Sequence, residues 1–276
     1  MTDDLFIWRA MSRTHWFDEG CHQALVDGRV KCFTYLSSGQ EAVAAAVACA
    51  FRDREVNLFC QHRNHAAYIA FGGDVAKLRD ELLGLETGTT RGVGGDPCHA
   101  FDGERAKMWG HDGLVGSHVP IGVGMAFATG EQSVVFFGDS AVEEDHFWPA
   151  VGFAVTHNLP VLFVCEDNDL SVITRTEKRR SWRAAGVAAS HGAIYVGDFD
   201  NDDPFQLLDF LRWPRAVARP MFVNVRTCRK YRHVGAGSDG PTAWDRMAMV
   251  RERMGEAGVE IEQAARREME ELWAII

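Results

Sequence analysis

The sequence predicts an α/β fold in which a doubly wound, mostly parallel sheet is flanked by helices. Two short apolar runs, residues 133–137 and 160–165, are rich in β-branched and aromatic side chains and have the length of buried strands. Residues 141–157 between them carry a helical pattern, and polar residues follow each run. Strand–helix–strand units of this kind are typical of parallel sheets with helices on their faces.

Two helices are predicted before this unit. Residues 5–27 place apolar side chains at spacings of three and four, as one face of a helix requires. A second helix covers residues 42–50, with Ser37 and Ser38 as candidate N-caps. Because residues 42–50 are small and apolar on every side, we expect this helix to lie in a core or between subunits.

The second half of the chain continues the alternation. Residues 193–196 and 221–225 are predicted as further strands, and a helix over residues 204–211, with Asp203 as its N-cap, lies between them. The charged, amphipathic residues 246–276 suit a C-terminal helical extension that packs on the surface or against a partner.

Composition excludes several classes of protein. Of 276 residues, 46% are hydrophobic and 25% are charged, as in ordinary globular domains. The net charge of −10 argues against general binding to nucleic acid or to an anionic membrane, and no apolar stretch approaches the roughly 20 residues that cross a bilayer. Seven cysteines without a C-x-x-C pair favour reduced thiols and a cytoplasmic location. No linker or repeat interrupts the chain, so residues 1–276 are expected to form a single domain.

The sharpest candidate for a functional site lies where the two apolar runs end. Asp139 follows the first run, and Asn168 follows the second, 29 positions later. This interval is one strand–helix–strand unit, so both side chains are expected at the same edge of the sheet. A carboxylate and a carboxamide oxygen there suit a divalent cation such as Mg²⁺, which binds few protein ligands together with phosphate oxygens. The alternative is that both residues only cap turns.

A basic segment follows this candidate cation site. It is either a solvated, mobile loop or a cover over an anionic group. Its five basic residues are Arg175, Lys178, Arg179, Arg180 and Arg183.

Several motifs occur in a characteristic order along the chain. Residues 138–141 (Gly-Asp-Ser-Ala) are followed, one strand–helix–strand unit later, by Asp-Asn at residues 167–168. Earlier segments are Gly-Gln-Glu-Ala at 39–42, Arg-Asn-His at 63–65, Gly-Gly at 94–95 with His99, and Gly-Leu-Val-Gly-Ser-His-Val-Pro-Ile-Gly at 113–122. Over residues 5–245 the series resembles the alpha subunit of the thiamine-diphosphate-dependent 2-oxo acid dehydrogenases. The resemblance implies the thiamine-diphosphate-binding fold, in its diphosphate-binding domain.

The resemblance also implies how a cofactor and a metal are held. Asp139 and Asn168 are expected to bind Mg²⁺, together with the backbone carbonyl of Leu170. Arg63 is expected to face the diphosphate, because a guanidinium matches phosphate oxygens. The full set of residues expected to bind thiamine diphosphate is His62, Arg63, Gly113, Val115, Gly138, Asp139, Ser140, Ala141, Asn168 and Leu170. Within it, backbone groups of Gly113 and Val115 are expected to face the aminopyrimidine ring.

Three histidines are implied to be catalytic. His233 matches a loop histidine near the reactive thiazolium carbon, and His99 and His65 are expected to line the same entrance. Imidazoles can stabilise a developing alkoxide or move protons close to neutral pH. The cofactor itself supplies the carbanion chemistry of decarboxylation, while the protein supplies position and electrostatics.

The implied function is that of an alpha subunit that acts on a 2-oxo acid by decarboxylation and acyl transfer or oxidation. The family's activating glutamate lies on a second α/β domain, for which this chain has no room. A beta-type partner subunit is therefore expected, with the cofactor at the interface of an α2β2 heterotetramer. Two alternatives stay open: a carboligase that transfers the acyl unit to an aldehyde or ketone, and a catalytically silent interaction subunit.

Four residues depart from the family's pattern, which is why the alternatives stay open. Ser140 replaces the second glycine of the Gly-Asp-Gly motif, and Asp167 replaces the first of two asparagines. His62 stands where a tyrosine is usual. Glu143 stands where an asparagine is usual, and adds negative charge near the expected cation.

Overall fold

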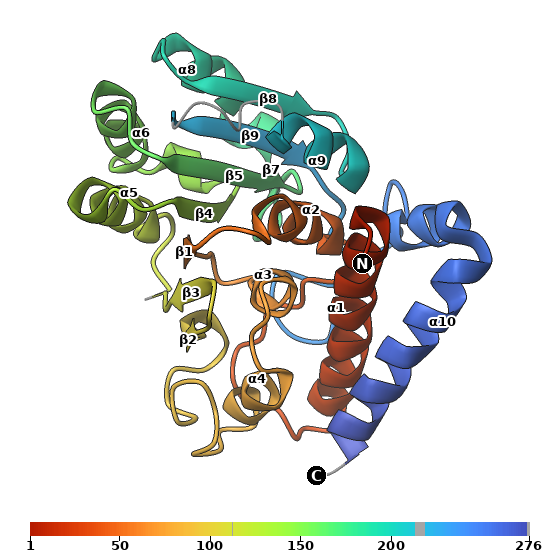
Figure 1. Cartoon of the computed structure of the whole chain (residues 1–276). Helices are drawn as coiled ribbons and strands as arrows, with labels where there is room; N and C mark the ends of the chain where they lie inside the picture. The colour runs from red at the N-terminus through yellow and green to blue at the C-terminus, as the bar shows by residue number, and fades with distance from the viewer. Residues whose placement is uncertain (112, 213–218, 275–276) are drawn as a thin grey trace.

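The computed structural model describes residues 1–111, 113–212 and 219–274 and is organised around a seven-stranded sheet (Figure 1). The strand order is β2-β3-β1-β4-β5-β9-β8. The strands are β1 (Val56–Phe59), β2 (Phe101–Asp102), β3 (Ala106–Trp109), β4 (Ser133–Gly138), β5 (Val161–Asp167), β8 (Tyr195–Phe199) and β9 (Met221–Arg226). Among these described strands, β2 pairs antiparallel to β3 and every other pair is parallel. The predicted mostly parallel α/β sheet is confirmed.

The central strands alternate their side chains between two hydrophobic clusters. Phe136 and Val164 lie in one cluster, whereas Phe137 and Phe163 lie in the other, and all four are at most 1% exposed. Residues buried on both faces of a sheet explain why the sequence reads as continuous apolar runs rather than as alternation.

Helices cover both faces (Figure 1). One face carries α1 (Asp3–Val26), α2 (Glu41–Phe51), α3 (His65–Ala70) and α9 (Pro204–Arg212). The other carries α5 (His118–Thr129), α6 (Phe147–Thr156) and α8 (Ala184–Ser190). The remaining helical elements are α4 (Val75–Leu82), α7 (Thr176–Arg179), the long α10 (Arg246–Ala274) and the 3₁₀ turns Asp96–Cys98 and Ala141–Glu143. A small antiparallel hairpin, β6 (Leu170–Ser171) and β7 (Thr174–Arg175), leads into α7.

The helix predicted at residues 42–50 lies in a core within this chain. All residues of α2 are buried, and α1, α3 and α9 pack against it. The expected serine N-caps are wrong, because both serines bond elsewhere. Ser37 Oγ accepts from the backbone N–H of Ala66, and Ser38 donates to the carboxylate of Asp18.

Two other boundaries differ from the prediction. Residues 141–143 form a separate 3₁₀ turn, and α6 begins only at Phe147. The strand predicted at 193–196 runs from Tyr195 to Phe199. Asp203 is the N-cap of α9 as expected, since its carboxylate accepts from the backbone N–H groups of Phe205 and Gln206.

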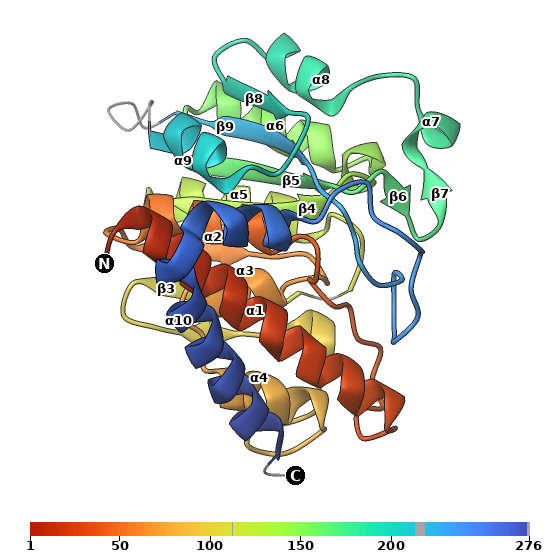
Figure 2. The same ribbon diagram turned by 90° about the vertical axis from the view of Figure 1, so that its right-hand side faces the viewer.

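The C-terminal helix lies along the first helix of the same chain (Figure 2). Trp8 Nε1 on α1 donates to the carbonyl of Gly258 on α10 at 2.8 Å. The helix changes direction at Gly255, whose φ of 54° is outside the helical region. The predicted extension 246–276 is thus helical up to residue 274, and residues 275 and 276 lie outside the described part. In the described residues, no helix combines the length and apolar character that a membrane span needs.

Candidate functional site

A cavity of about 150 Å³ lies at the carboxyl ends of the parallel strands β1, β4 and β5. Ligands bind at this edge in open α/β sheets. The cavity collects the expected cofactor-binding residues and one expected catalytic histidine: His62, Arg63, Gly113, Val115, Gly138, Asp139, Ser140, Ala141, Asn168, Leu170 and His233. His65 and His99 do not line it. Residues far apart in the sequence therefore meet where spacing and resemblance predict.

The expected cation ligands Asp139, Asn168 and Leu170 all line the cavity. Asp139 follows β4 and is 1% exposed. Asn168 follows β5, where its side-chain amide donates to Gln40 Oε1 at 2.8 Å and its Oδ1 accepts from the backbone N–H of Leu170 at 3.1 Å. Burial and the nearby carboxylate of Asp167 raise the pKa of Asp139. A buried carboxylate in this position requires a positive partner.

In this structure the positive partner is a guanidinium. Arg179 forms an ion pair with the carboxylate of Asp139, and Thr176 Oγ1 donates to the same oxygen at 3.2 Å. Arg180 donates to the backbone carbonyl of Asp139 at 2.6 Å. Both arginines also contact Glu143 at 2.5 Å, so the negative charge of this unusual residue is compensated.

The basic segment thus divides into two parts. The side chains of Arg179 and Arg180 are 10% and 4% exposed and cover the site. The side chains of Arg175, Lys178 and Arg183 are 65–74% exposed and face solvent. The segment therefore combines two arginines that are buried against Asp139 and Glu143 with three basic side chains that are exposed.

Two further guanidinium groups, those of Arg63 and Arg229, are buried at the same cavity. Arg63 donates to the backbone carbonyls of Leu36 and His233. Burial and the neighbouring Arg229 lower the pKa of Arg63 to about 10. Arg229 is 5% exposed, lines the cavity and pairs with Asp239, and its Nη1 has no hydrogen-bond partner among the described residues. A buried donor without a partner is costly, so Nη1 of Arg229 is a candidate donor to an anion in this cavity.

Sequence reasoning missed Arg229. The available signal was its position three residues after β9, at the same carboxyl edge of the sheet as Asp139 and Asn168. Tyr35 was missed as well, and it lies in a loop for which the sequence offers no pattern.

Three rings form the remaining wall. The ring centroids of Tyr35 and His62 are 4.4 Å apart, and that of His233 lies 5.0 Å from His62 and 5.3 Å from Tyr35. Burial and the charge of Arg63 lower the pKa of His233 to about 4. The same two causes place the pKa of His62 well below its ordinary value. Both imidazoles are therefore neutral at pH 7 and can donate or accept a hydrogen bond.

The expectation that His65 and His99 line the entrance is wrong. They are 0% and 1% exposed, and both bond to Oδ1 of Asp96, at 2.6 and 3.0 Å. His65 also contacts Asp18 at 2.7 Å. These buried carboxylates hold both histidine rings inside the core. The rings therefore lie behind the cavity wall and do not line the cavity.

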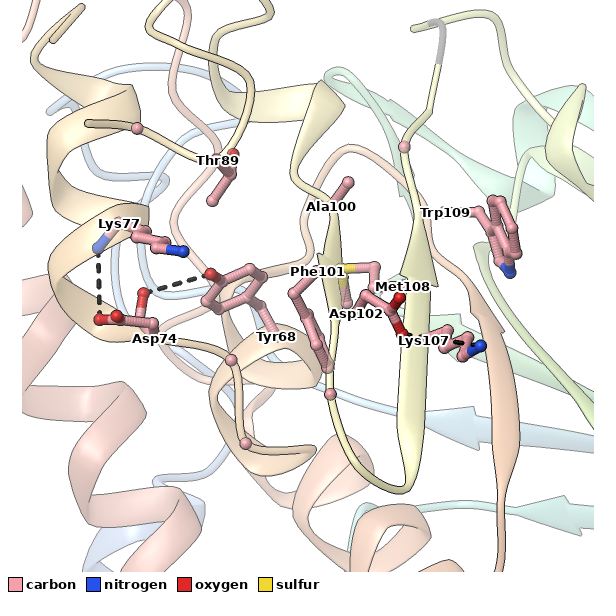
Figure 3. Close-up of a pocket in the computed structure, with 15 residues that line it drawn as sticks. Tyr68, Asp74, Lys77, Thr89, Ala100, Phe101, Asp102, Lys107, Met108 and Trp109 are labelled. Atoms are coloured by element: carbon pink, nitrogen blue, oxygen red, sulfur yellow. Dashed lines mark hydrogen bonds and ion pairs between the residues drawn. The ribbon is translucent and has the colours of Figure 1, made fainter. Parts of the chain in front are cut away.

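A larger surface hollow of about 650 Å³ lies beside β2, β3 and α4 (Figure 3). Tyr68, Phe101 and Trp109 contribute its apolar part. Of its charged groups, Lys107 and Asp102 contact each other at 3.7 Å. None of the residues expected from the sequence to bind cofactor, metal or substrate lies in this hollow.

Solved structures of similar shape share the fold. Transketolase from Campylobacter jejuni superposes with a TM-score of 0.63 at 13% identity, and transketolase from Leishmania mexicana with 0.61 at 15%. Each covers 99% of this chain, which spans 49% and 47% of those chains, or about half their length. At this identity the likeness shows the fold alone.

Sequence comparisons are more specific. The model of the dehydrogenase E1 component family matches residues 9–257. Pyruvate dehydrogenase E1 component subunit alpha from Zymomonas mobilis is 28% identical over 249 residues, which are 87% of this chain and 69% of that protein. The subunit of the same name from Rickettsia bellii is 30% identical over 237 residues, 83% of this chain and 71% of that protein. The resemblance found in the sequence is confirmed, and the chain belongs to the dehydrogenase E1 component family.

Proposed function

We propose that this chain is the alpha subunit of a thiamine-diphosphate-dependent enzyme that decarboxylates a 2-oxo acid and passes on the acyl group. The observation that carries the proposal is the single cavity in which Asp139, Asn168, Arg63 and His233 meet. Membership of the dehydrogenase E1 component family and relatives named pyruvate dehydrogenase E1 subunit alpha support it.

The residues present fit the cofactor. Asp139, Asn168 and the carbonyl of Leu170 offer the oxygen ligands that Mg²⁺ prefers. The unpartnered Nη1 of Arg229 fits a diphosphate or carboxylate. The cavity wall is tight at Gly138, because a Cβ there would lie 3.1 Å from Gln61 Oε1, closer than an ordinary van der Waals contact. Asp139, Asn168 and Leu170 would therefore hold Mg²⁺, and Arg63 and Arg229 would bind the diphosphate.

Each group of this chain has a distinct task in the proposed reaction. The bound cofactor supplies the nucleophilic carbon and accepts the electrons released as carbon dioxide leaves. Arg63 and Arg229 bind and orient anionic groups. Backbone groups of Gly113 and Val115 orient the aminopyrimidine ring. The neutral His233 donates a hydrogen bond to the oxygen of the substrate carbonyl as negative charge develops there.

We further propose a beta-type partner that covers the cavity mouth. Beside the cavity, Leu114 is 67% and Val115 47% exposed, and the adjoining α5 exposes Ile121 and Phe127 by 58% and 55%. An apolar patch of this kind fits a protein interface. The partner subunit supplies the activating glutamate, and the assembly is an α2β2 heterotetramer.

Two further proposals concern the chain as a whole. Residues 1–276 form one domain. All seven cysteines are free, and this favours a cytoplasmic location.

The test is to purify the chain with a beta-type partner and to supply thiamine diphosphate, Mg²⁺ and a series of 2-oxo acids. Reduction of an artificial electron acceptor identifies a dehydrogenase. A new carbon–carbon bond with an added aldehyde identifies the carboligase alternative. Absence of cofactor binding by calorimetry, with Asp139→Ala equal to the wild type, would show that this is a silent interaction subunit.

A further inference from the structure

The contact between Arg179 and Asp139 excludes another cation from the same carboxylate oxygen. Oδ2 of Asp139 accepts from Arg179 and from Thr176 Oγ1, and the Asp139 and Arg179 side chains are only 2% and 10% exposed. A carboxylate oxygen that is buried under a guanidinium has no room for a divalent cation. A metal ion and the guanidinium would therefore compete for Oδ2 of Asp139.

The competing arginine is attached to the hairpin that carries an expected metal ligand. β6 begins at Leu170, β7 ends at Arg175, and α7 follows without a break. The backbone N–H of Thr176 donates to Asp169 Oδ1 at 3.2 Å, which ties the start of α7 to the segment next to Asn168. Binding of a cation by Asn168 and Leu170 and release of Arg179 would thus occur on one connected piece of chain.

Glu143 gives the two arginines a second anchor beside the site. It lies 2.5 Å from Arg179 Nη1 and 2.5 Å from Arg180 Nη1. If Arg179 leaves Asp139, Glu143 still holds both guanidinium groups next to Asp139. A positively charged pair there would stabilise the negative charge of a diphosphate that binds with the cation.

We propose that residues 176–180 form a latch in which Arg179 takes the place of the divalent cation when the chain is unloaded. Entry of the cation with the diphosphate displaces Arg179 from Asp139, and Glu143 retains Arg179 and Arg180 as part of the lid over the anion. This inference rests on the proposed function, since it requires that Asp139 binds the metal. It assigns the basic segment a role in controlling when the cofactor binds.

The test compares the affinity of the full chain, with its partner subunit, for Mn²⁺ in the presence of thiamine diphosphate. Equilibrium dialysis or calorimetry measures the dissociation constant without any turnover. Arg179→Gln removes the competing guanidinium. Mn²⁺ then no longer has to break a hydrogen bond between charged groups, so we expect its binding to tighten by about tenfold. Arg179→Lys keeps the charge but loses the fork that joins Asp139 to Glu143, and we expect an intermediate gain.

Lys178→Gln is the matched control. Lys178 lies on the same short helix, and its substitution by glutamine removes the same charge. The ion pair that Lys178 forms is with the exposed Glu177. Its affinity should stay within about twofold of the wild type, because exposed ion pairs contribute little.

The outcomes separate the latch from the proposed function. If the wild type binds metal and cofactor and Arg179→Gln binds equally or more weakly, the latch is wrong and the function stands. If neither the wild type nor Arg179→Gln nor Arg179→Lys binds, the proposed function fails and the latch with it. Tight binding by Arg179→Gln alone supports both.

Discussion

Nε2 of His65 lies 2.6 Å from Oδ1 of Asp96, and neither side chain is exposed. Nδ1 of the same ring contacts Asp18 at 2.7 Å, so one imidazolium joins two buried carboxylates. Asp96 also accepts from the backbone N–H of Tyr35, one of the rings at the cavity. A charge network inside the core therefore fixes part of the wall of the functional site.

We expect His65→Gln to lower the free energy of unfolding by about 3–5 kcal/mol at pH 7, because two buried carboxylates lose their shared cation. Burial opposes the charge on His65, but Asp96 and Asp18 outweigh it and raise the pKa of His65 from 6.5 to about 10. The folded state thus holds the proton more tightly. The stabilisation is complete below about pH 6.5 and is lost as the pH rises toward 10.

Urea unfolding at about pH 6 and about pH 9.5 checks both effects. The wild type should lose more stability over this interval than His65→Gln. The control is His157→Gln, a substitution of an exposed histidine. Equal losses in the wild type and in His65→Gln would mean that His65 is not protonated in the folded protein.

Asp139→Asn should weaken binding of Mg²⁺ with thiamine diphosphate by about two orders of magnitude, because it removes the one charged ligand of the cation. Asp167→Asn is the matched control. It changes a nearby acid that pairs with Arg226 at 3.0 Å, and it restores the asparagine that is usual in the family. Calorimetry measures both. A stronger loss of binding in Asp167→Asn would show that the cation is not held by Asp139.

Arg229→Gln should weaken binding of the anionic cofactor or raise KM for the 2-oxo acid by about tenfold, because the unpartnered Nη1 is lost. Arg232→Gln, three positions further along, changes an exposed arginine and should leave both quantities unaltered. Cofactor affinity and KM are measured separately to show which anion Arg229 binds. If neither the cofactor affinity nor KM changes in Arg229→Gln, Nη1 of Arg229 does not bind an anion.

His233→Gln should reduce kcat by about 10²- to 10⁴-fold with little change in KM, as expected for a group that acts on the reacting oxygen. Burial and Arg63 hold the pKa of His233 at about 4, so its own protonation should produce no change in rate between pH 5.5 and 8. His62→Tyr, which introduces the tyrosine usual in the family, serves as the control and should retain activity. Unaltered kcat in His233→Gln would exclude the catalytic role.

Gly122→Ala should destabilise the fold by about 1–3 kcal/mol through overpacking. A Cβ at Gly122 would lie 2.7 Å from Val135 and 3.0 Å from Phe59, so α5 packs on the sheet at this glycine. Gly124→Ala is the matched control on the same helix, because a Cβ there meets nothing within 4 Å. It should stabilise by up to about 1 kcal/mol through helix propensity. Thermal unfolding measures the stability of both variants. If Gly122→Ala is as stable as the wild type, α5 does not pack closely on the sheet at this glycine.

Much of the site could be predicted from the sequence. Asp139 and Asn168 follow apolar runs, and the alternation of strands and helices already implies that their carboxyl ends meet at one edge. Motifs added Arg63 and His233. A central strand is buried on both faces, so its consecutive residues are all apolar. Such a continuous apolar run is easily recognised in the sequence.

Tertiary structure decided which titratable groups face the cavity. The motif predicted that His65 lines the cavity. Its partners Asp18 and Asp96 lie 47 and 31 positions away in the sequence, and their hydrogen bonds hold the ring in the core. Arg229 reaches the cavity, and Arg179 reaches Asp139 across 40 positions. Local sequence determines the strands and helices, since their periodicity depends on adjacent residues. The charge and exposure of a side chain depend on which distant groups the completed fold places beside it.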